Sequence, residues 1–235
     1  MTRPEVDASK LFKEAFERER FREEKECLRQ ENMEVLLKSG RFGSALTYAT
    51  ELHAGQVRKD TSVPYIAHLL GVASLAFEYG PDKDGPNEDL VIAALLHDAV
   101  EDQGGAKTLQ QIKRRFGSTV AAIVDGCSDT DVDPKPKWRP RKEAYLERLT
   151  RESPAVRLVS ACDKLHNVRA IIRDYRAHGD RLWRRFNAGK DGTLWYYSAL
   201  VKVYQTAECT PVVADLVREV ATLRRLVRAR ASHQS

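Results

Sequence analysis

Cysteine is scarce in this sequence, and its few cysteines are far apart. Four occur in 235 residues, Cys27, Cys127, Cys162 and Cys209, and no two of them form a CxxC pair. A zinc knuckle needs closely spaced cysteine pairs, and four cysteines spaced this widely do not suggest a disulfide framework either. The spacing therefore favours reduced, mainly buried thiols.

Long hydrophobic runs are also missing. The uncharged apolar runs are far shorter than the ~20 residues that a membrane-spanning helix requires, and no signal-like segment opens the chain. With 42% hydrophobic and 31% charged residues, the composition is typical of a soluble globular protein. We expect no membrane partner and a cytoplasmic location.

The alternating pattern of half-buried strands does not occur convincingly, and apolar residues recur at helical spacing instead. An all-α protein is predicted: a helical bundle with a helical N-terminal extension. The predicted helices cover 7–38, 42–53, 64–79, 88–102, 108–116, 118–124, 141–151, 193–205 and 211–230, with a longer helix from 154. Residues 125–140 are predicted to form an irregular loop, plausible as a lid, and residues 189–192 to interrupt the helices.

Three segments are predicted along the chain. Residues 1–40 form an arm that serves either as a dimerisation or regulatory element or as a solvated extension. Residues 41–205 form the main domain, and residues 206–235 a helix that packs on it or extends it. A homo-oligomer is left open.

Charge is divided unevenly between the two halves of the chain. Residues 1–133 hold 17 Lys and Arg against 24 Asp and Glu, whereas residues 134–235 hold 22 against 10. A basic half is typical of nucleic-acid binding. Folded over carboxylates, it would equally form a pocket for a small polyphosphate and its metal.

The strongest chemical signal directly follows the apolar run 90–96. His97, Asp98, Glu101 and Asp102 place four ionisable groups within six residues. On a continuous helix, His97 and Glu101 share one side, as do Asp98 and Asp102. A helix cap or surface pair is the ordinary explanation of a lone His-Asp. At the edge of a core, however, charges need partners or a metal ion.

A second polar group interrupts an apolar helix. Asp163 and Asn167 are four residues apart, and a buried aspartate requires either a basic partner or a metal. Together with His68, His97 and Asp98, Asp163 completes two imidazoles and two carboxylates on three predicted helices. This donor set suits an octahedral Mn²⁺ or Fe²⁺ with positions open to water.

Three motifs in order carry a family resemblance: Pro-Tyr-Ile-x-His at 64–68, His-Asp-x-x-Glu-Asp at 97–102 and Asp-Lys-Leu-x-Asn at 163–167. They resemble the HD superfamily of metal-dependent phosphohydrolases and, within it, the RelA/SpoT guanosine 3′,5′-bisdiphosphate 3′-pyrophosphohydrolases. Arg58-Lys59 belongs to the same signature. The resemblance spans about residues 45 to 202, which leaves no room for a synthetase domain and points to the stand-alone small alarmone hydrolases.

The resemblance implies a role for each matched residue. His68, His97, Asp98 and Asp163 would bind Mn²⁺ or another divalent transition metal, and Glu101 and Asp102 would activate the attacking water. Arg58 and Lys59 would hold the base and its 5′ side, and Asn167 the ribose side. The implied reaction releases pyrophosphate from the 3′ position of (p)ppGpp or (p)ppApp. The partner is a small nucleotide and no nucleic acid is expected.

Three departures from the family pattern affect the substrate side. Leu69 follows His68 where proline is usual, residues 81–86 add a turn, and Ala170 stands where longer members often carry a hydroxyl. They leave the metal set intact and leave the choice between guanine and adenine open.

Several other polar residues have two interpretations. His53 is expected to be a polar helix-end residue, and His166 to pack or to support a metal ligand. Lys190 is predicted to bind substrate phosphates, and the aromatics Trp195, Tyr196 and Tyr197 either stack on a base or form core. The basic residues of 135–142 either form a solvated face or neutralise the leaving pyrophosphate.

Two rival functions remain. Another HD phosphohydrolase, acting on a nucleotide or NADPH as a phosphomonoesterase, would share the metal site and release phosphate. A non-catalytic nucleotide or nucleic-acid binding module would use the basic half, and its decayed site would be expected to lack ligands.

Overall fold

The computed structural model describes residues 17, 19, 20, 39–80, 87–129, 136–207 and 209–232. Within these ranges the regular elements are helices, and one isolated β-bridge joins Val57 and Pro64. The all-α prediction is confirmed. The helices are α2 (Arg41–Leu52), α3 (Ile66–Tyr79), α4 (Glu88–Leu96), α5 (Ala99–Asp102), α6 (Gly105–Phe116), α7 (Ser118–Cys127), α8 (Trp138–Leu149), α9 (Pro154–His178), the 3₁₀ helix η1 (Gly179–Arg185), α10 (Gly189–Ala207) and α11 (Pro211–Ser232).

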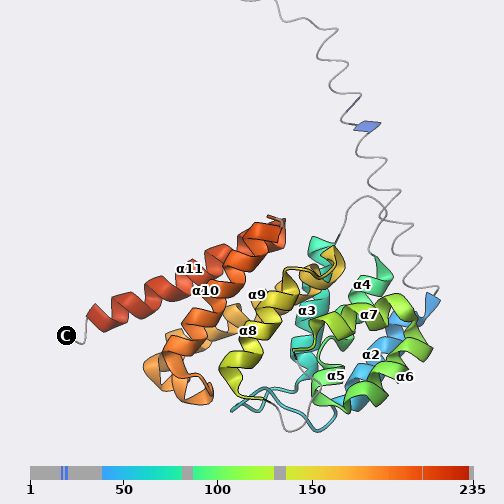
Figure 1. Ribbon diagram of the computed structural model, residues 1–235, viewed down its shortest axis with the longest axis horizontal. Helices are drawn as coiled ribbons and strands as arrows, with labels where there is room; N and C mark the ends of the chain where they lie inside the picture. The colour runs from blue at the N-terminus through green and yellow to red at the C-terminus, as the bar shows by residue number, and fades with distance from the viewer. Residues whose placement is uncertain are drawn as a thin grey trace, which may run out of the picture.

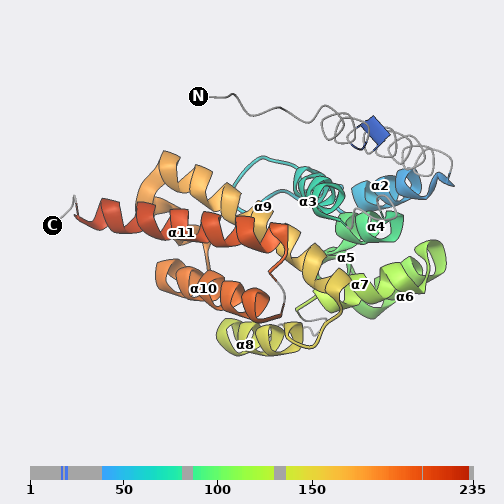
Figure 2. The same ribbon diagram turned by 90° about the horizontal axis from the view of Figure 1, so that it is seen from above.

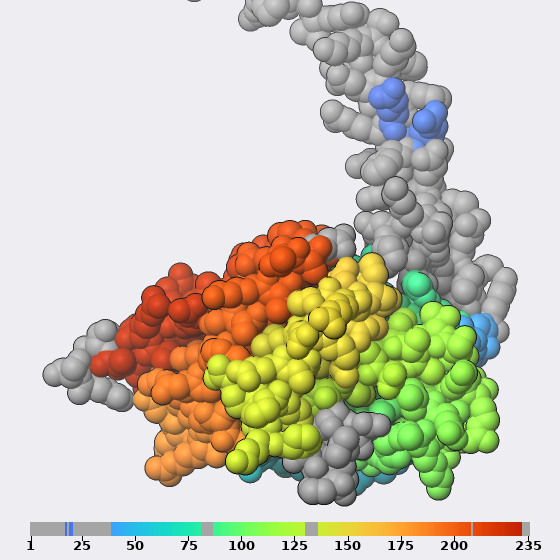
Figure 3. Space-filling view, viewed as in Figure 1, coloured from blue at the N-terminus to red at the C-terminus, as the bar shows by residue number. Residues whose placement is uncertain are grey.

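Helix α9 is the longest described element, at 25 residues, and it organises the molecule. It begins with Pro154, which loses no hydrogen bond by lacking an N–H, because amides of the first turn have no acceptor within the helix. The Ser153 hydroxyl caps this end by accepting from the Val156 amide at 3.3 Å. It packs against α3, α4 and α7 and also against α11 and η1 (Figure 1, Figure 2). In Figure 3, α8 and α9 lie between the green N-terminal helices and the orange and red C-terminal ones.

Helix α4 lies at the centre of the N-terminal helices, and its residues 90–96 are at most 2% exposed. A helix that is apolar on every side is stable only when it is covered on every side. The side chain of Asn87 caps it by accepting from the Leu90 amide at 3.2 Å, as its position predicted. This buried helix ends at Leu96, and His97, which directly follows, is buried with it.

The single helix predicted over 88–102 is wrong, because the chain breaks at His97 and Asp98 between α4 and α5. The carbonyl of Ala94, which would accept from the Asp98 amide in a continuing helix, accepts from His97 Nδ1 at 2.8 Å. This side-chain bond competes with the helical ladder at the point where the helix stops. The same-side argument for His97 and Glu101 therefore does not apply.

Other boundaries also differ from the prediction. Helix α6 begins at Gly105 rather than Thr108, and α8 begins at Trp138 rather than at 141, because Pro140 lies in its first turn where no amide donor is needed. Residues 189–192 form the first turn of α10 and do not interrupt it. The 3₁₀ helix η1 was not predicted.

The predicted segments are addressed only in part. Apart from residues 17, 19 and 20, the arm up to residue 38 lies outside the described residues, so its role stays a prediction. Helix α11 packs against α9 and α10, and the boundaries at 41 and 205 stay predictions. No described helix is long and apolar enough to cross a membrane.

Candidate metal centre and its cavity

Four predicted ligands come together from three places in the fold. His68 lies in the first turn of α3, His97 and Asp98 lie at the break between α4 and α5, and Asp163 lies in α9. His97 Nε2 is 2.9 Å from Asp98 Oδ2 and 3.7 Å from Asp163 Oδ1. His68 Nε2 is 3.2 Å from Asp163 Oδ1 and 3.6 Å from Asp98 Oδ2. Two imidazoles and two carboxylates thus face one another.

The break in the chain explains how two sequence neighbours serve one site. Adjacent residues of a regular helix point about 100° apart, whereas His97 and Asp98 approach each other here. The bond from His97 Nδ1 to the Ala94 carbonyl fixes the proton on Nδ1, which leaves Nε2 as a lone-pair donor.

The environment of the site fits a divalent cation. Nε2 of His68 and Nε2 of His97 are buried and have no hydrogen-bond partner within the described part of the chain. Buried nitrogen atoms are costly without a partner. Ligand atoms of His68, His97 and Asp98 lie within 4.8 Å of one another, and nitrogen and carboxylate donors suit Mn²⁺ or Fe²⁺.

The charges at the centre stabilise one another strongly. Burial alone would lower the pKa of His97, but Asp98 and Asp163 outweigh it and raise that pKa well above its usual value. Burial alone would raise the pKa of Asp98, but the facing imidazoles hold it well below its usual range. A metal ion that binds here replaces the proton shared by these groups.

The sequence left open whether Asp163 pairs with a basic side chain or faces a metal site, and in the structure its two oxygens do one each. Its Oδ2 accepts from Lys164 Nζ at 2.5 Å, while its Oδ1 faces the imidazoles and accepts from Asn167 Nδ2. Burial would raise the pKa of Asp163, but Lys164 and the two histidines hold it well below its usual range. The predicted shared face of Asp163 and Asn167 is confirmed.

Two supporting residues were missed, although both lie within the motifs. Tyr65 Oη donates to Asp98 Oδ2 at 2.5 Å, and burial together with Asp98 raises the pKa of this tyrosine. Lys164 pairs with Asp163. Their signal was the fixed place of each residue in Pro-Tyr-Ile-x-His and Asp-Lys-Leu-x-Asn, but a motif does not say which ligand a neighbour orients.

The other two histidines near the centre occupy different positions. His53 ends α2, where its Nδ1 lies 2.7 Å from Gln56 Oε1 and its ring stacks on Tyr65. It is therefore a helix-end residue, as predicted, although it is buried. His166 Nδ1 lies 2.9 Å from His68 Nδ1. Burial lowers the pKa of His166 to about 4.

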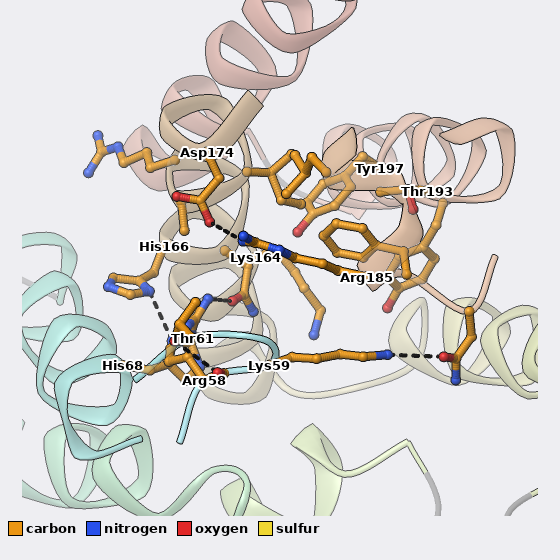
Figure 4. A pocket seen from close by; sticks show the side chains of 18 of the residues that line it. Arg58, Lys59, Thr61, His68, Lys164, His166, Asp174, Arg185, Thr193 and Tyr197 are labelled. Atoms are coloured by element: carbon orange, nitrogen blue, oxygen red, sulfur yellow. Dashed lines mark hydrogen bonds and ion pairs between the residues drawn. The ribbon is translucent and has the colours of Figure 1, made fainter. Parts of the chain in front are cut away.

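A cavity of about 1170 Å³ opens beside the centre, with His68 in its wall. Cations from both halves of the chain line it (Figure 4). They are Arg58, Lys59, Arg141, Lys142, Lys164, Arg169, Arg173 and Arg185. The acids in its wall are Glu101 and Asp174, and Asp174 pairs with Arg173 and Arg185 at 3.1 and 3.2 Å. This excess of positive charge favours a polyanionic ligand.

Most of the predicted substrate residues reach this cavity. Arg58, Lys59 and Asn167 line it, and Arg58 Nη2 donates to Asn167 Oδ1 at 2.9 Å. Because the Asn167 amide also donates to Asp163, it links Arg58 to a predicted metal ligand. Lys59 Nζ donates to Asn187 Oδ1 at 3.0 Å. Lys190 is not among the lining residues.

The structure separates the two carboxylates that were predicted to activate water. Glu101 lines the cavity, and Arg141 Nη1 lies 3.4 Å from its Oε1. Asp102 is exposed, accepts from Gln56 Nε2 at 2.9 Å and is not in the cavity wall. Glu101 is therefore the better placed of the two.

The basic residues of 135–142 divide between the two interpretations. Arg141 and Lys142 line the cavity, and both pair with the buried carboxylate of Asp129. Arg139 is exposed and lies over the Trp195 ring. Lys135 lies outside the described residues. Of the aromatics, Tyr196 and Tyr197 line the cavity and are nearly buried, so they serve as both wall and core.

Comparison with known families and sequences gives a consistent result. Residues 45–194 match the HD domain family. A segment of 133 residues is 38% identical to the human guanosine-3′,5′-bis(diphosphate) 3′-pyrophosphohydrolase MESH1, covering 55% of this chain and 68% of that one. The zebrafish MESH1 is 36% identical over 129 residues, 54% of this chain and 67% of that one.

Longer relatives and a solved structure extend the comparison. The Haemophilus influenzae 3′-pyrophosphohydrolase is 38% identical over 130 residues, which are 52% of this chain and only 17% of that protein. A metazoan SpoT orthologue, described as hydrolysing ppGpp, superposes with a TM-score of 0.63 at 26% identity. That match covers 79% of this chain and 96% of the other.

Proposed function

Since this chain belongs to the HD domain family, we propose that it is a Mn²⁺-dependent hydrolase that removes the 3′-pyrophosphate of (p)ppGpp or its adenine analogue (p)ppApp. One observation carries the proposal: in the described part of the chain, two buried imidazole nitrogens that make no hydrogen bond lie 2.9–3.7 Å from two carboxylates at the wall of a cation-lined cavity. The vertebrate relatives named as 3′-pyrophosphohydrolases support the same reaction.

Each residue at the centre has a defined task in this proposal. His68, His97, Asp98 and Asp163 would hold the metal, which when bound supplies a Lewis acid and lowers the pKa of water. Tyr65 orients Asp98, and Lys164 orients Asp163. Glu101, in the cavity wall, accepts the proton of the attacking water. The exposed carboxylate of Asp102 accepts a hydrogen bond from Gln56, and we do not propose that it touches the substrate.

The bond changes follow from attack at the phosphorus nearest the ribose. Water gives one proton to Glu101 and forms a new P–O bond, the bond from that phosphorus to the 3′ oxygen breaks, and the leaving 3′ oxygen takes up the proton that Glu101 received. The products are pyrophosphate and the nucleoside 5′-diphosphate or 5′-triphosphate. Arg141 and Lys142 line the side of the cavity where Glu101 lies, so we assign them to the negative charge of the diphosphate group that passes to water and is released as pyrophosphate.

The remaining cations position the rest of the nucleotide. Arg58 and Lys59 would hold the base and its 5′ side, and Asn167 is fixed between Arg58 and Asp163 on the ribose side. The volume of about 1170 Å³ is at the upper end for a small-molecule site, which leaves room for a nucleotide with five phosphates. Lys190 is not proposed as a ligand of the substrate.

Product analysis tests this proposal directly. Purified protein with Mn²⁺ is offered ppGpp, pppApp and NADPH in parallel, with a chelator-treated sample as control. Pyrophosphate from a 3′-diphosphorylated nucleotide, abolished by the chelator, is expected and identifies the base. Release of phosphate alone would establish the phosphomonoesterase. Salt-sensitive binding of nucleic acid without turnover would establish a binding module.

The cytoplasmic location and the small-nucleotide partner are part of the same proposal. A homo-oligomer stays a prediction, because the structure contains one chain.

A further inference from the structure

The two metal-facing histidines are fixed by different kinds of partner. His97 Nδ1 bonds to the backbone carbonyl of Ala94 at 2.8 Å, and a change of the Ala94 side chain would leave that carbonyl in place. His68 Nδ1 instead lies 2.9 Å from Nδ1 of His166, a side chain on α9 (Figure 4). The orientation of one ligand is therefore set by its own helix, whereas that of the other depends on a side chain from a different helix.

The direction of the bond between His68 and His166 follows from the chemistry of the site. Nε2 of His68 faces Asp98 and Asp163 and must keep its lone pair for a cation. The proton of His68 is then on Nδ1, so Nδ1 of His68 donates and Nδ1 of His166 accepts. The two rings are held close, with centroids 4.8 Å apart.

Space for the His166 ring is provided by Gly71, one turn after His68 on α3. A Cβ built on Gly71 would lie far inside van der Waals distance of Nε2 and Cδ2 of His166, and 3.3 Å from Cε1. Glycine is unfavourable within a helix relative to alanine, and the backbone of Gly71 does not have a positive φ. Close approach of the ring therefore explains why a glycine stands here.

We propose that His166 and Gly71 act as a positioning pair for the metal ligand His68: His166 accepts from His68 Nδ1, and Gly71 makes room for the ring that does so. The inference depends on one part of the proposed function, namely that the centre binds a divalent cation. It concerns residues to which the predicted reaction assigns no role.

The test measures Mn²⁺ binding to the full chain by calorimetry, without substrate. His166→Ala should weaken Mn²⁺ binding about 10- to 100-fold, the usual effect of losing a partner that orients a ligand. His166→Asn should restore most of the affinity, because its amide oxygen replaces Nδ1 as acceptor. Arg176→Ala, a control at an exposed position of the same helix outside the cavity wall, should bind as the wild type does.

Gly71→Ala gives the second arm. Its methyl group should displace the His166 ring and weaken Mn²⁺ binding as His166→Ala does, although alanine favours the helix. The double variant should bind no more weakly than His166→Ala alone, because the ring that the methyl displaces is gone. Melting curves of the metal-free variants establish that each is folded.

Four results would overturn the proposal: wild-type affinity in His166→Ala, no recovery in His166→Asn, wild-type affinity in Gly71→Ala, or additive losses in the double variant. A wild-type protein that binds Mn²⁺ but releases no pyrophosphate would refute the proposed function and leave this inference standing.

Discussion

The Asp129→Asn substitution tests how the cations of the cavity wall are held. The Asp129 carboxylate is 5% exposed and pairs with Arg141, 2.5 Å away, and with Lys142. Burial would raise its pKa, but the charges and hydrogen bonds of Lys142 and Arg141 outweigh it and lower the pKa of Asp129. The isosteric amide removes the charge and leaves the shape.

The size of the effect follows from burial. Removing one partner of a fully buried ion pair costs about 3–5 kcal/mol. The side chains of Arg141 and Lys142 are 13% and 17% exposed, so water reaches them, and Arg141 keeps Glu101 at 3.4 Å. We therefore expect a loss of about 2–3 kcal/mol in the free energy of unfolding at pH 7. For a chain of this size, that loss lowers Tm by roughly 5–10 °C.

The lowered pKa of Asp129 also determines how its contribution to stability changes with pH. A carboxylate whose pKa is lowered by folding stabilises the protein above its unfolded pKa, and this contribution is lost as pH falls through the folded pKa. The folded pKa of Asp129 lies below 3.8. The gap between wild type and Asp129→Asn should therefore be constant near neutral pH and close only in acid below about pH 4.

Chemical denaturation of the metal-free protein at several pH values measures this gap. Asp125→Asn, at an exposed position of the preceding helix α7, is the control and should change stability by less than about 0.5 kcal/mol. An Asp129→Asn protein as stable as the wild type, or a gap that persists unchanged into acid, would refute the reasoning.

Three further predictions concern the metal centre. Asp163→Ala should lose Mn²⁺ binding and turnover but keep its helical circular dichroism; full turnover would contradict its place among the ligands. Glu101→Gln should keep Mn²⁺ affinity while kcat falls about 10²- to 10⁴-fold, and an equal loss of metal in titration would show that Glu101 is a ligand. Mn²⁺ at 100 times its Kd should stabilise the wild type by about 2.7 kcal/mol; a thermal-shift assay without any increase in Tm would mean that the centre does not bind it.

The helices and the residues that meet at the candidate metal site could be predicted from the sequence because both depend on local pattern. Apolar spacing located the buried α4, and the order of His68, His97-Asp98 and Asp163 identified residues that converge within 3.7 Å from three elements. Spacing could not reveal the break after Leu96, because it depends on where the His97 side chain finds an acceptor.

Contacts between residues far apart in the chain could not be predicted from the sequence, for a different reason. The pairing of Arg58 with Asn167 spans 109 positions, and that of His68 with His166 spans 98. No periodicity encodes such a pairing, since it is set by how α9 packs against the N-terminal helices. The same holds for Lys190, which belongs to a basic and aromatic stretch but does not reach the cavity wall.

The fold brings the acidic and basic halves of the chain together at one site. The acidic half supplies His68, His97 and Asp98, and the basic half supplies six of the eight cations in the cavity wall. Asp163 crosses this division, because it is a metal-facing carboxylate from the basic half, held by its neighbour Lys164. A surface for nucleic acid would need its cations spread along an exposed face. Here the wall cations surround a cavity beside the candidate metal centre, an arrangement that fits the small polyphosphate of the proposed function.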